Sequence, residues 1–154
     1  MIVEPRHSRL VTPEEIKNLM EVCFAAGQPC PVVITGSSMT PFLVPGRDRV
    51  FLRPAPPALR RGDIAFYERA PGRLVLHRVY RASPEGYYFV GDAQTAIEGP
   101  IRRDQILAVA AEAERKGRPQ RPGCFWWWFF RTVWLRLVPA RRAIMTAYAK
   151  LKTQ

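Results

Sequence analysis

The sequence predicts a mainly β protein, with a helix before the strands and a basic, aromatic segment after them that is expected to be helical. Fifteen prolines and ten glycines are spread among short apolar runs, which favours many strands and turns over a helical bundle. The 154 residues suffice for one domain with a substantial core plus appendages. We therefore divide the chain into an N-terminal helical segment (1–29), a β domain (30–115) and a C-terminal segment (116–154).

The N-terminal segment contains a clear helix start. Thr12 is a suitable N-cap, Pro13 fits the first turn, and Glu15 stands three residues after the cap, as in a capping box. Apolar residues recur at helical spacing as far as Phe24, and Gly27 is a natural stop. Because no long apolar run follows a basic region here, neither a secretory signal nor an N-terminal membrane anchor is expected.

Six apolar runs in the β domain are typical of strands, and proline-rich or glycine-containing loops separate them. The runs are residues 31–35, 49–53, 63–68, 73–81, 86–90 and 106–114.

The same domain carries the parts of an activated hydroxyl. Ser38 lies in a Gly-Ser-Ser-Met-Thr-Pro segment, His77 in a strand-like run, and Asp92 follows a glycine. A serine hydroxyl is a poor nucleophile near neutral pH unless a base takes its proton, and a neutral imidazole suits that transfer. An acid on the far ring nitrogen would fix the tautomer. We hypothesise that Ser38 is the nucleophile, His77 the base and Asp92 the orienting acid.

Each of these residues also has a purely structural interpretation. A serine pair between Gly36 and a nearby proline is typical of a turn, and an aspartate after a glycine is typical of an Asx turn. A histidine on a half-buried strand face is usually a packing residue. His7, the other histidine, lies in a charged N-terminal stretch and is expected to be solvated.

The wider pattern resembles a known family. Over residues 32–112 the chain resembles type I signal peptidases and the related LexA-like self-cleaving repressors. The motifs, in family order, lie at 36–41, 45–50, 60–66, 74–79 and 88–92. This resemblance implies a serine endopeptidase with Ser38 as nucleophile. Most bacterial members have Lys-Arg-Val where this chain has His77-Arg78-Val79, so it is similar to the histidine branch found in the endoplasmic reticulum, archaea and some spore-forming bacteria.

The resemblance also implies further site residues. In the histidine branch the aspartate equivalent to Asp92 supports the histidine, and a second acid tends to follow a few residues later; Glu98 is the nearest candidate. Many signal peptidases carry an oxyanion-binding serine two residues before the nucleophile, a place held here by Gly36. The oxyanion would then depend on backbone N–H groups near the nucleophile.

The residues around the nucleophile complete the predicted site. Ser37, Met39 and Pro41 are the candidates for oxyanion and substrate binding. By resemblance the substrate would be an extended peptide or preprotein bound beside a strand. Its residues near the cleaved bond would be small, as in signal or leader peptide processing. The alternatives are a dedicated maturation peptidase, a self-cleaving regulator, or a catalytically silent peptide-binding module.

Cysteine usage indicates neither a disulfide framework nor a metal site. Cys23, Cys30 and Cys124 form an odd set without C-x-x-C spacing. We therefore expect no cofactor and no metal in the reaction.

Charge is concentrated at the C-terminus. Residues 115–154 contain ten of the Lys and Arg side chains, no Asp or Glu, and the aromatic run Phe-Trp-Trp-Trp-Phe-Phe at 125–130. The uncharged stretch is shorter than the ~20 residues of a membrane span, but tryptophan and arginine both favour the surface of an anionic bilayer. We expect either peripheral membrane association through this segment or, as the alternative, a cytoplasmic protein whose aromatics are core. Nucleic acid is a less favoured partner, because the three tryptophans are consecutive.

Overall fold

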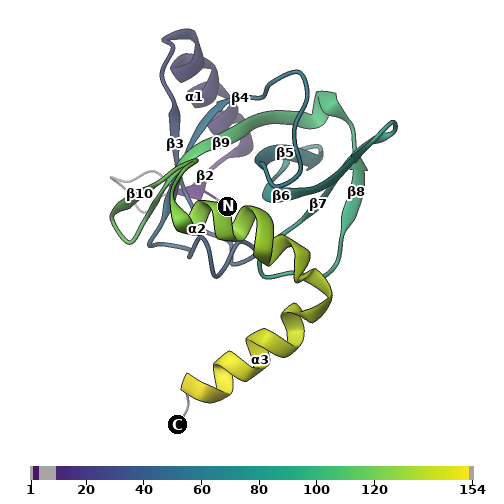
Figure 1. Cartoon of the computed structure of the whole chain (residues 1–154). Helices are drawn as coiled ribbons and strands as arrows, with labels where there is room; N and C mark the ends of the chain where they lie inside the picture. Colours follow the sequence, from purple (N-terminus) through teal and green to yellow (C-terminus); the bar gives the residue numbers. More distant parts are fainter. Residues whose placement is uncertain (1, 4–9, 153–154) are drawn as a thin grey trace.

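The computed structural model describes residues 2–3 and 10–152 (Figure 1). His7, predicted to be solvated, lies outside these residues. The elements in chain order are β1 (Ile2–Val3), β2 (Leu10–Val11), α1 (Pro13–Ala25), β3 (Cys30–Val33), β4 (Arg49–Pro54), β5 (Ile64–Ala70), β6 (Arg73–Ser83), β7 (Gly86–Val90), β8 (Glu98–Ile101), a 3-10 turn (Arg103–Gln105), β9 (Ile106–Arg115), β10 (Arg118–Gln120), α2 (Phe125–Phe129), a π-helical stretch (Phe130–Trp134), a second 3-10 turn (Val138–Ala140) and α3 (Arg141–Lys152).

The fold is mainly β, as predicted. Eight antiparallel strands form one curved sheet in the order β3-β4-β9-β5-β6-β7-β8, with β10 paired to β9, while β1 and β2 form a separate ribbon. All six expected strands are present, with small shifts at their ends. Four further strands were not predicted: the two-residue β1 and β2, and β8 and β10, where Gly99-Pro100 and Pro119 interrupt the pattern that marks a strand.

Local sequence signals account for α1. The N–H of Glu15 donates to the Thr12 hydroxyl at 3.2 Å, and the N–H of Thr12 donates to the Glu15 carboxylate at 2.8 Å, so the predicted capping box is confirmed. Ile16 and Met20 are buried in the core and anchor the helix against the β3 side of the sheet (Figure 1).

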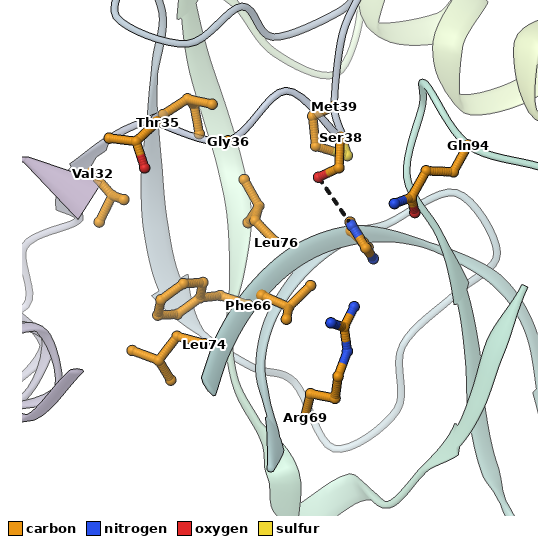
Figure 2. A pocket seen from close by; sticks show the side chains of 13 residues that line it. Val32, Thr35, Gly36, Ser38, Met39, Phe66, Arg69, Leu74, Leu76 and Gln94 are labelled. Atoms are coloured by element: carbon orange, nitrogen blue, oxygen red, sulfur yellow. Dashed lines mark hydrogen bonds between the residues drawn. The ribbon is translucent and has the colours of Figure 1, made fainter. Parts of the chain in front are cut away.

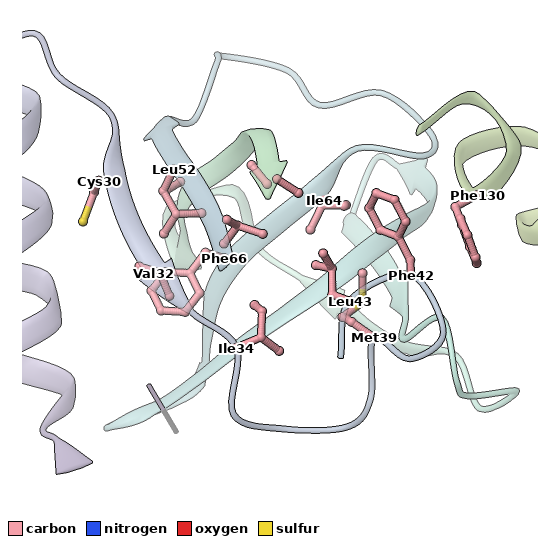
Figure 3. Close-up of a cluster of buried hydrophobic side chains, with 14 of the residues drawn as sticks. Cys30, Val32, Ile34, Met39, Phe42, Leu43, Leu52, Ile64, Phe66 and Phe130 are labelled. Atoms are coloured by element: carbon pink, nitrogen blue, oxygen red, sulfur yellow. The ribbon is translucent and has the colours of Figure 1, made fainter. Parts of the chain in front are cut away.

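Strand register determines which side chains share a face. Ala65 pairs with His77, Val79 with Phe89, and Phe89 with Glu98, so these side chains lie on one face of the sheet. That face carries a small apolar cluster around Tyr67 and Phe89. The opposite face carries the larger core, which includes Val32, Ile34, Phe42, Ile64 and Phe66 (Figure 3). Neighbouring residues of β6, among them His77 and Arg78, therefore point to opposite faces.

The C-terminal segment has an inner and an outer face. Trp127, Phe130 and Trp134 are buried in the larger core, and the rings of Phe42 and Phe130 are 4.9 Å apart between centroids. The outer face is formed by Phe125, Trp126 and Trp128, which are 62%, 43% and 51% exposed. α3 then turns away from the sheet (Figure 1). Within the described ranges, no helix is long and apolar enough to cross a bilayer.

Candidate active site

The two residues expected to perform the chemistry lie together. Ser38 is half-buried in the turn after β3, and His77 is buried on β6. The Ser38 Oγ and the His77 Nε2 are 3.0 Å apart, a hydrogen bond drawn as the dashed line in Figure 2. This distance suits transfer of the hydroxyl proton to the imidazole.

A cavity of about 250 Å³ leads to this pair. Its walls come from β3 and the turn after it, from β5 and from β6. Within the described ranges, β3 is hydrogen-bonded to β4 alone, although β1 lies close to it, and the first half of β6 is paired with β5 alone, because β7 joins β6 from Arg78 onward. The lining is mostly apolar and includes Val32, Ile34, Phe66, Leu74, Val75 and Leu76 (Figure 2).

The other ring nitrogen of His77 contacts an acid. The Nδ1 is 3.0 Å from the Glu98 Oε1 and 3.2 Å from the Tyr67 hydroxyl. Tyr67 also donates to Glu98, and the Arg69 guanidinium donates to both Glu98 oxygens at 2.7 and 2.9 Å. Since an ionised carboxylate can only accept, we assign the imidazole proton to Nδ1. The lone pair of Nε2 then faces Ser38.

The surroundings hold these groups in the protonation states that base catalysis needs. Burial lowers the pKa of His77 below its ordinary value, although the Glu98 carboxylate acts in the opposite direction. Burial also disfavours ionisation of Glu98, but hydrogen bonds from Arg69 and Tyr67 outweigh it and keep the pKa of Glu98 low. Burial, together with Glu98, raises the pKa of Tyr67. Near neutral pH the site therefore combines a neutral imidazole, an ionised carboxylate and a protonated phenol.

Asp92 does not occupy the position that the sequence analysis gave it. Both its oxygens accept from the Arg78 guanidinium, at 2.9 and 2.8 Å, and both side chains are buried. The remaining Arg78 nitrogen donates to the Gly62 carbonyl at 2.9 Å. Because Arg78 and His77 point to opposite faces of β6, an acid paired with Arg78 cannot reach Nδ1 of His77. Among the described residues, the carboxylate that contacts Nδ1 is that of Glu98.

Of the residues near Ser38 that were predicted to bind the oxyanion or the substrate, Met39 alone lies at the cavity. Met39 is buried and lines it, whereas Ser37 is exposed and Pro41 is half-buried, and neither lines it. Within the described part of the chain, no hydrogen bond uses the N–H of Ser38. That N–H is therefore free to act as an oxyanion donor. Among the cavity residues that the sequence did not predict are two with long polar side chains, Arg69 and Gln94, the latter just after the Gly-Asp motif.

Gly91 is required by a close backbone approach. A Cβ at this position would lie 2.5 Å from the Ser38 carbonyl oxygen and 2.8 Å from the Gln94 side chain. The same carbonyl oxygen accepts from the N–H of Ala93 at 2.9 Å. The Gly-Asp motif thus brings a turn directly against the backbone of Ser38.

Comparisons with protein-family models, curated proteins and solved structures found no match for this chain. In the described ranges, no group of three or more His, Cys, Asp or Glu side chains is placed to hold a metal ion. Functional assignment therefore rests on the motifs and on the geometry around Ser38.

We predict that His77 titrates below the ordinary histidine pKa of ~6.5. Replacing Glu98 by Gln should lower this pKa further, because the carboxylate favours the imidazolium. NMR titration of the His77 ring in a His7→Gln background would measure both values, with the remote Glu85→Gln as control. A midpoint at or above the ordinary value would contradict the buried, neutral base.

We predict that Asp92→Asn destabilises the fold by about 3 kcal/mol or more, since it leaves the buried Arg78 cation without its partner. Asp104→Asn, which removes an exposed ion pair with Arg102, should have little effect. Urea unfolding of the two variants would compare them. Equal stabilities would show that the buried pair is not structurally important.

Proposed function

We propose that this protein is a serine endopeptidase that cleaves an extended peptide or preprotein. One observation carries the proposal: Ser38, His77 and Glu98 form a continuous hydrogen-bonded line that ends at an open, apolar cavity. A serine, an imidazole and a carboxylate in this order are the parts of an activated nucleophile. The resemblance of the motifs to signal peptidases of the histidine branch supports the same activity.

The reaction follows from the assigned tautomer. The Ser38 Oγ attacks the carbonyl carbon of the scissile bond while Nε2 of His77 takes the hydroxyl proton. Glu98 stabilises the resulting imidazolium without itself taking the proton. As the C–N bond breaks, the imidazolium gives the proton to the leaving amine, and an ester to Ser38 remains. Water, deprotonated by His77, then attacks the ester and regenerates the hydroxyl.

The oxyanion of the tetrahedral intermediate needs donors fixed in advance. The N–H of Ser38 is one of the backbone donors at the nucleophile that make no hydrogen bond within the described residues. Gly36, where many signal peptidases have a serine, lines the cavity without a side chain, so backbone N–H groups would carry this task.

Substrate binding by strand addition fits the cavity. An extended peptide lying between the open edges of β3 and β6 would form backbone hydrogen bonds to either strand, which tolerates varied sequence. Its side chains would meet the apolar walls, which include Ile34 and Leu76. By resemblance, residues near the cut would be small, as in signal or leader peptides. A dedicated maturation peptidase and a self-cleaving regulator would use the same site.

We predict that Ser38→Ala and His77→Ala each abolish covalent labelling by a fluorophosphonate probe and cleavage of fluorogenic peptides. The nucleophile and its base act as one unit, so each loss should exceed ~100-fold. Glu98→Gln should also slow the reaction, because an amide can stabilise the wrong imidazole tautomer. Ser83→Ala, in the distant β6–β7 hairpin, is the matched control.

The outcomes separate enzyme from binding module. Labelling of Ser38 that depends on His77 supports a peptidase. A folded protein that is not labelled, yet binds extended peptides, would instead be a silent peptide-binding module. Retention of more than about a tenth of the activity by folded His77→Ala would remove the imidazole from the mechanism.

We also propose that the protein associates peripherally with anionic membranes. Phe125, Trp126 and Trp128 present aromatic rings to solvent on the outer face. Tryptophan favours the bilayer interface, and each nearby cation adds about 1 kcal/mol on an anionic surface. Seven of the ten cations after residue 114 are exposed: Lys116, Arg118, Arg121, Arg136, Arg142, Lys150 and Lys152.

We predict that changing Phe125, Trp126 and Trp128 together to Ser leaves the fold intact and abolishes binding to vesicles of phosphatidylcholine with phosphatidylserine. Binding of the unmodified protein should weaken in high salt, because salt screens the cationic attraction. Vesicle sedimentation would measure both effects. Trp127→Ser is the contrasting variant, since this ring is 5% exposed and packs on Phe42, so it should destabilise the fold. Failure of the unmodified protein to bind anionic vesicles would overturn the membrane proposal.

A further inference from the structure

We propose that Arg141 and Trp134 are positioning residues for Ser38, acting through the turn at residues 91–94. The catalytic meaning of this inference rests on the proposed function of Ser38, while the contacts themselves do not. It gives the C-terminal segment a role in the reaction that is independent of membrane binding.

Arg141 holds the turn by its carbonyl groups. Its side chain is fully buried, and one guanidinium nitrogen, Nη1, donates to the carbonyls of Gly91 at 2.8 Å and Gln94 at 2.9 Å. Its Nη2 and Nε donate to the Trp134 carbonyl at 3.0 and 3.3 Å. One planar cation thus joins both ends of the turn to the segment that precedes α3.

Trp134 holds the same turn at a third point. Its indole N–H donates to the Asp92 carbonyl at 2.8 Å, and its ring packs in the larger core. The Arg141 guanidinium lies 5.2 Å from the centre of this ring, so the two side chains also stabilise each other.

The turn transmits this constraint to the nucleophile. The N–H of Ala93 donates to the Ser38 carbonyl at 2.9 Å, and the absence of a Cβ at Gly91 lets the two backbones meet. Arg141 and Trp134 of the C-terminal segment therefore bind three of the four carbonyls of the turn, those of Gly91, Asp92 and Gln94. The Ala93 N–H of the same turn binds Ser38. A shift of the C-terminal segment would therefore move the Ser38 backbone relative to His77.

Ordinary core packing does not explain an arginine here. Burying a guanidinium is costly, and apolar side chains fill such positions more cheaply. Burial lowers the pKa of Arg141 to about 10, which still leaves it charged near neutral pH. The neighbouring Arg142 is exposed and borders a hollow that Ala93 and Gln94 also line, but within the described residues its guanidinium donates no hydrogen bond to the turn. This difference provides a matched control one residue away.

The test compares Arg141→Met, Arg141→Lys and Trp134→Phe with Arg142→Met. Fluorophosphonate labelling of Ser38 gives the maximal labelling rate and the probe concentration for half-maximal rate separately. We expect Arg141→Met to slow the maximal labelling rate by about 10-fold or more, because the substitution releases the turn that holds Ser38. The probe concentration for half-maximal rate should stay within about two-fold, because neither Arg141 nor Trp134 lines the cavity. Arg141→Lys should restore part of the rate, and Arg142→Met should match the unmodified protein.

A second measurement keeps the inference separate from stability and from the proposed function. Hydrogen exchange of the Ala93 amide should accelerate in Arg141→Met and Trp134→Phe. Met20→Ala, on α1, which borders neither the turn nor the cavity, should lower overall stability without changing the labelling rate of the folded protein. If Arg141→Met does not fold, the milder Trp134→Phe variant decides by the same readouts.

Unchanged labelling rate and unchanged Ala93 exchange in the folded variants would overturn the inference. If the unmodified protein is not labelled, the proposed peptidase function fails. Hydrogen exchange of the Ala93 amide then still decides whether the C-terminal segment holds the turn against Ser38.

Discussion

The buried ion pair between Arg78 and Asp92 is the interaction on which the site depends. Two charges removed from water must be fully satisfied, and here the guanidinium is bound by both Asp92 oxygens and the Gly62 carbonyl. The pair therefore fixes the turn after β7 against β6. The same turn supports the Ser38 backbone, because its Ala93 N–H donates to the Ser38 carbonyl. The opposite face of β6 carries His77. Adjacent residues of one strand thus have different partners: Arg78 pairs with the buried Asp92, and His77 contacts Ser38 and Glu98.

The charges around His77 are arranged so that no group has to change its protonation state before the proposed reaction begins. Glu98 is kept ionised by Arg69 and Tyr67, which come from alternate positions of β5. The same guanidinium lowers the proton affinity of the imidazole, whereas Glu98 raises it. Burial is the largest influence on the pKa of His77, and together with the guanidinium it outweighs Glu98 and leaves the ring neutral. The hydrogen-bonded line from Glu98 to Ser38 is consequently prepared by its surroundings rather than by binding of a ligand.

Sequence alone predicted what depends on local patterns: the capping of α1, the six regular strands, and the pairing of Ser38 with His77 through the family motifs. It misassigned Asp92, because strand alternation places residues 77 and 78 on opposite faces but does not reveal which of the two Asp92 contacts. Glu98 was named only as a nearby acid, since Gly99-Pro100 hides β8 and the contact crosses β7. The buried face of the C-terminal segment could have been predicted from the sequence, because Trp127, Phe130 and Trp134 recur at helical spacing.

The open edge of β3 has a consequence for how copies of this chain meet one another. An exposed edge strand is a template for unwanted pairing and aggregation. Pro31 stands in this edge, exposed, and has no N–H to offer. A long invading strand would lose a hydrogen bond there, whereas a short segment beside residues 32–36 would not reach it. The proline thus favours brief, local occupancy of the edge over the continuous ladders from which fibrils grow.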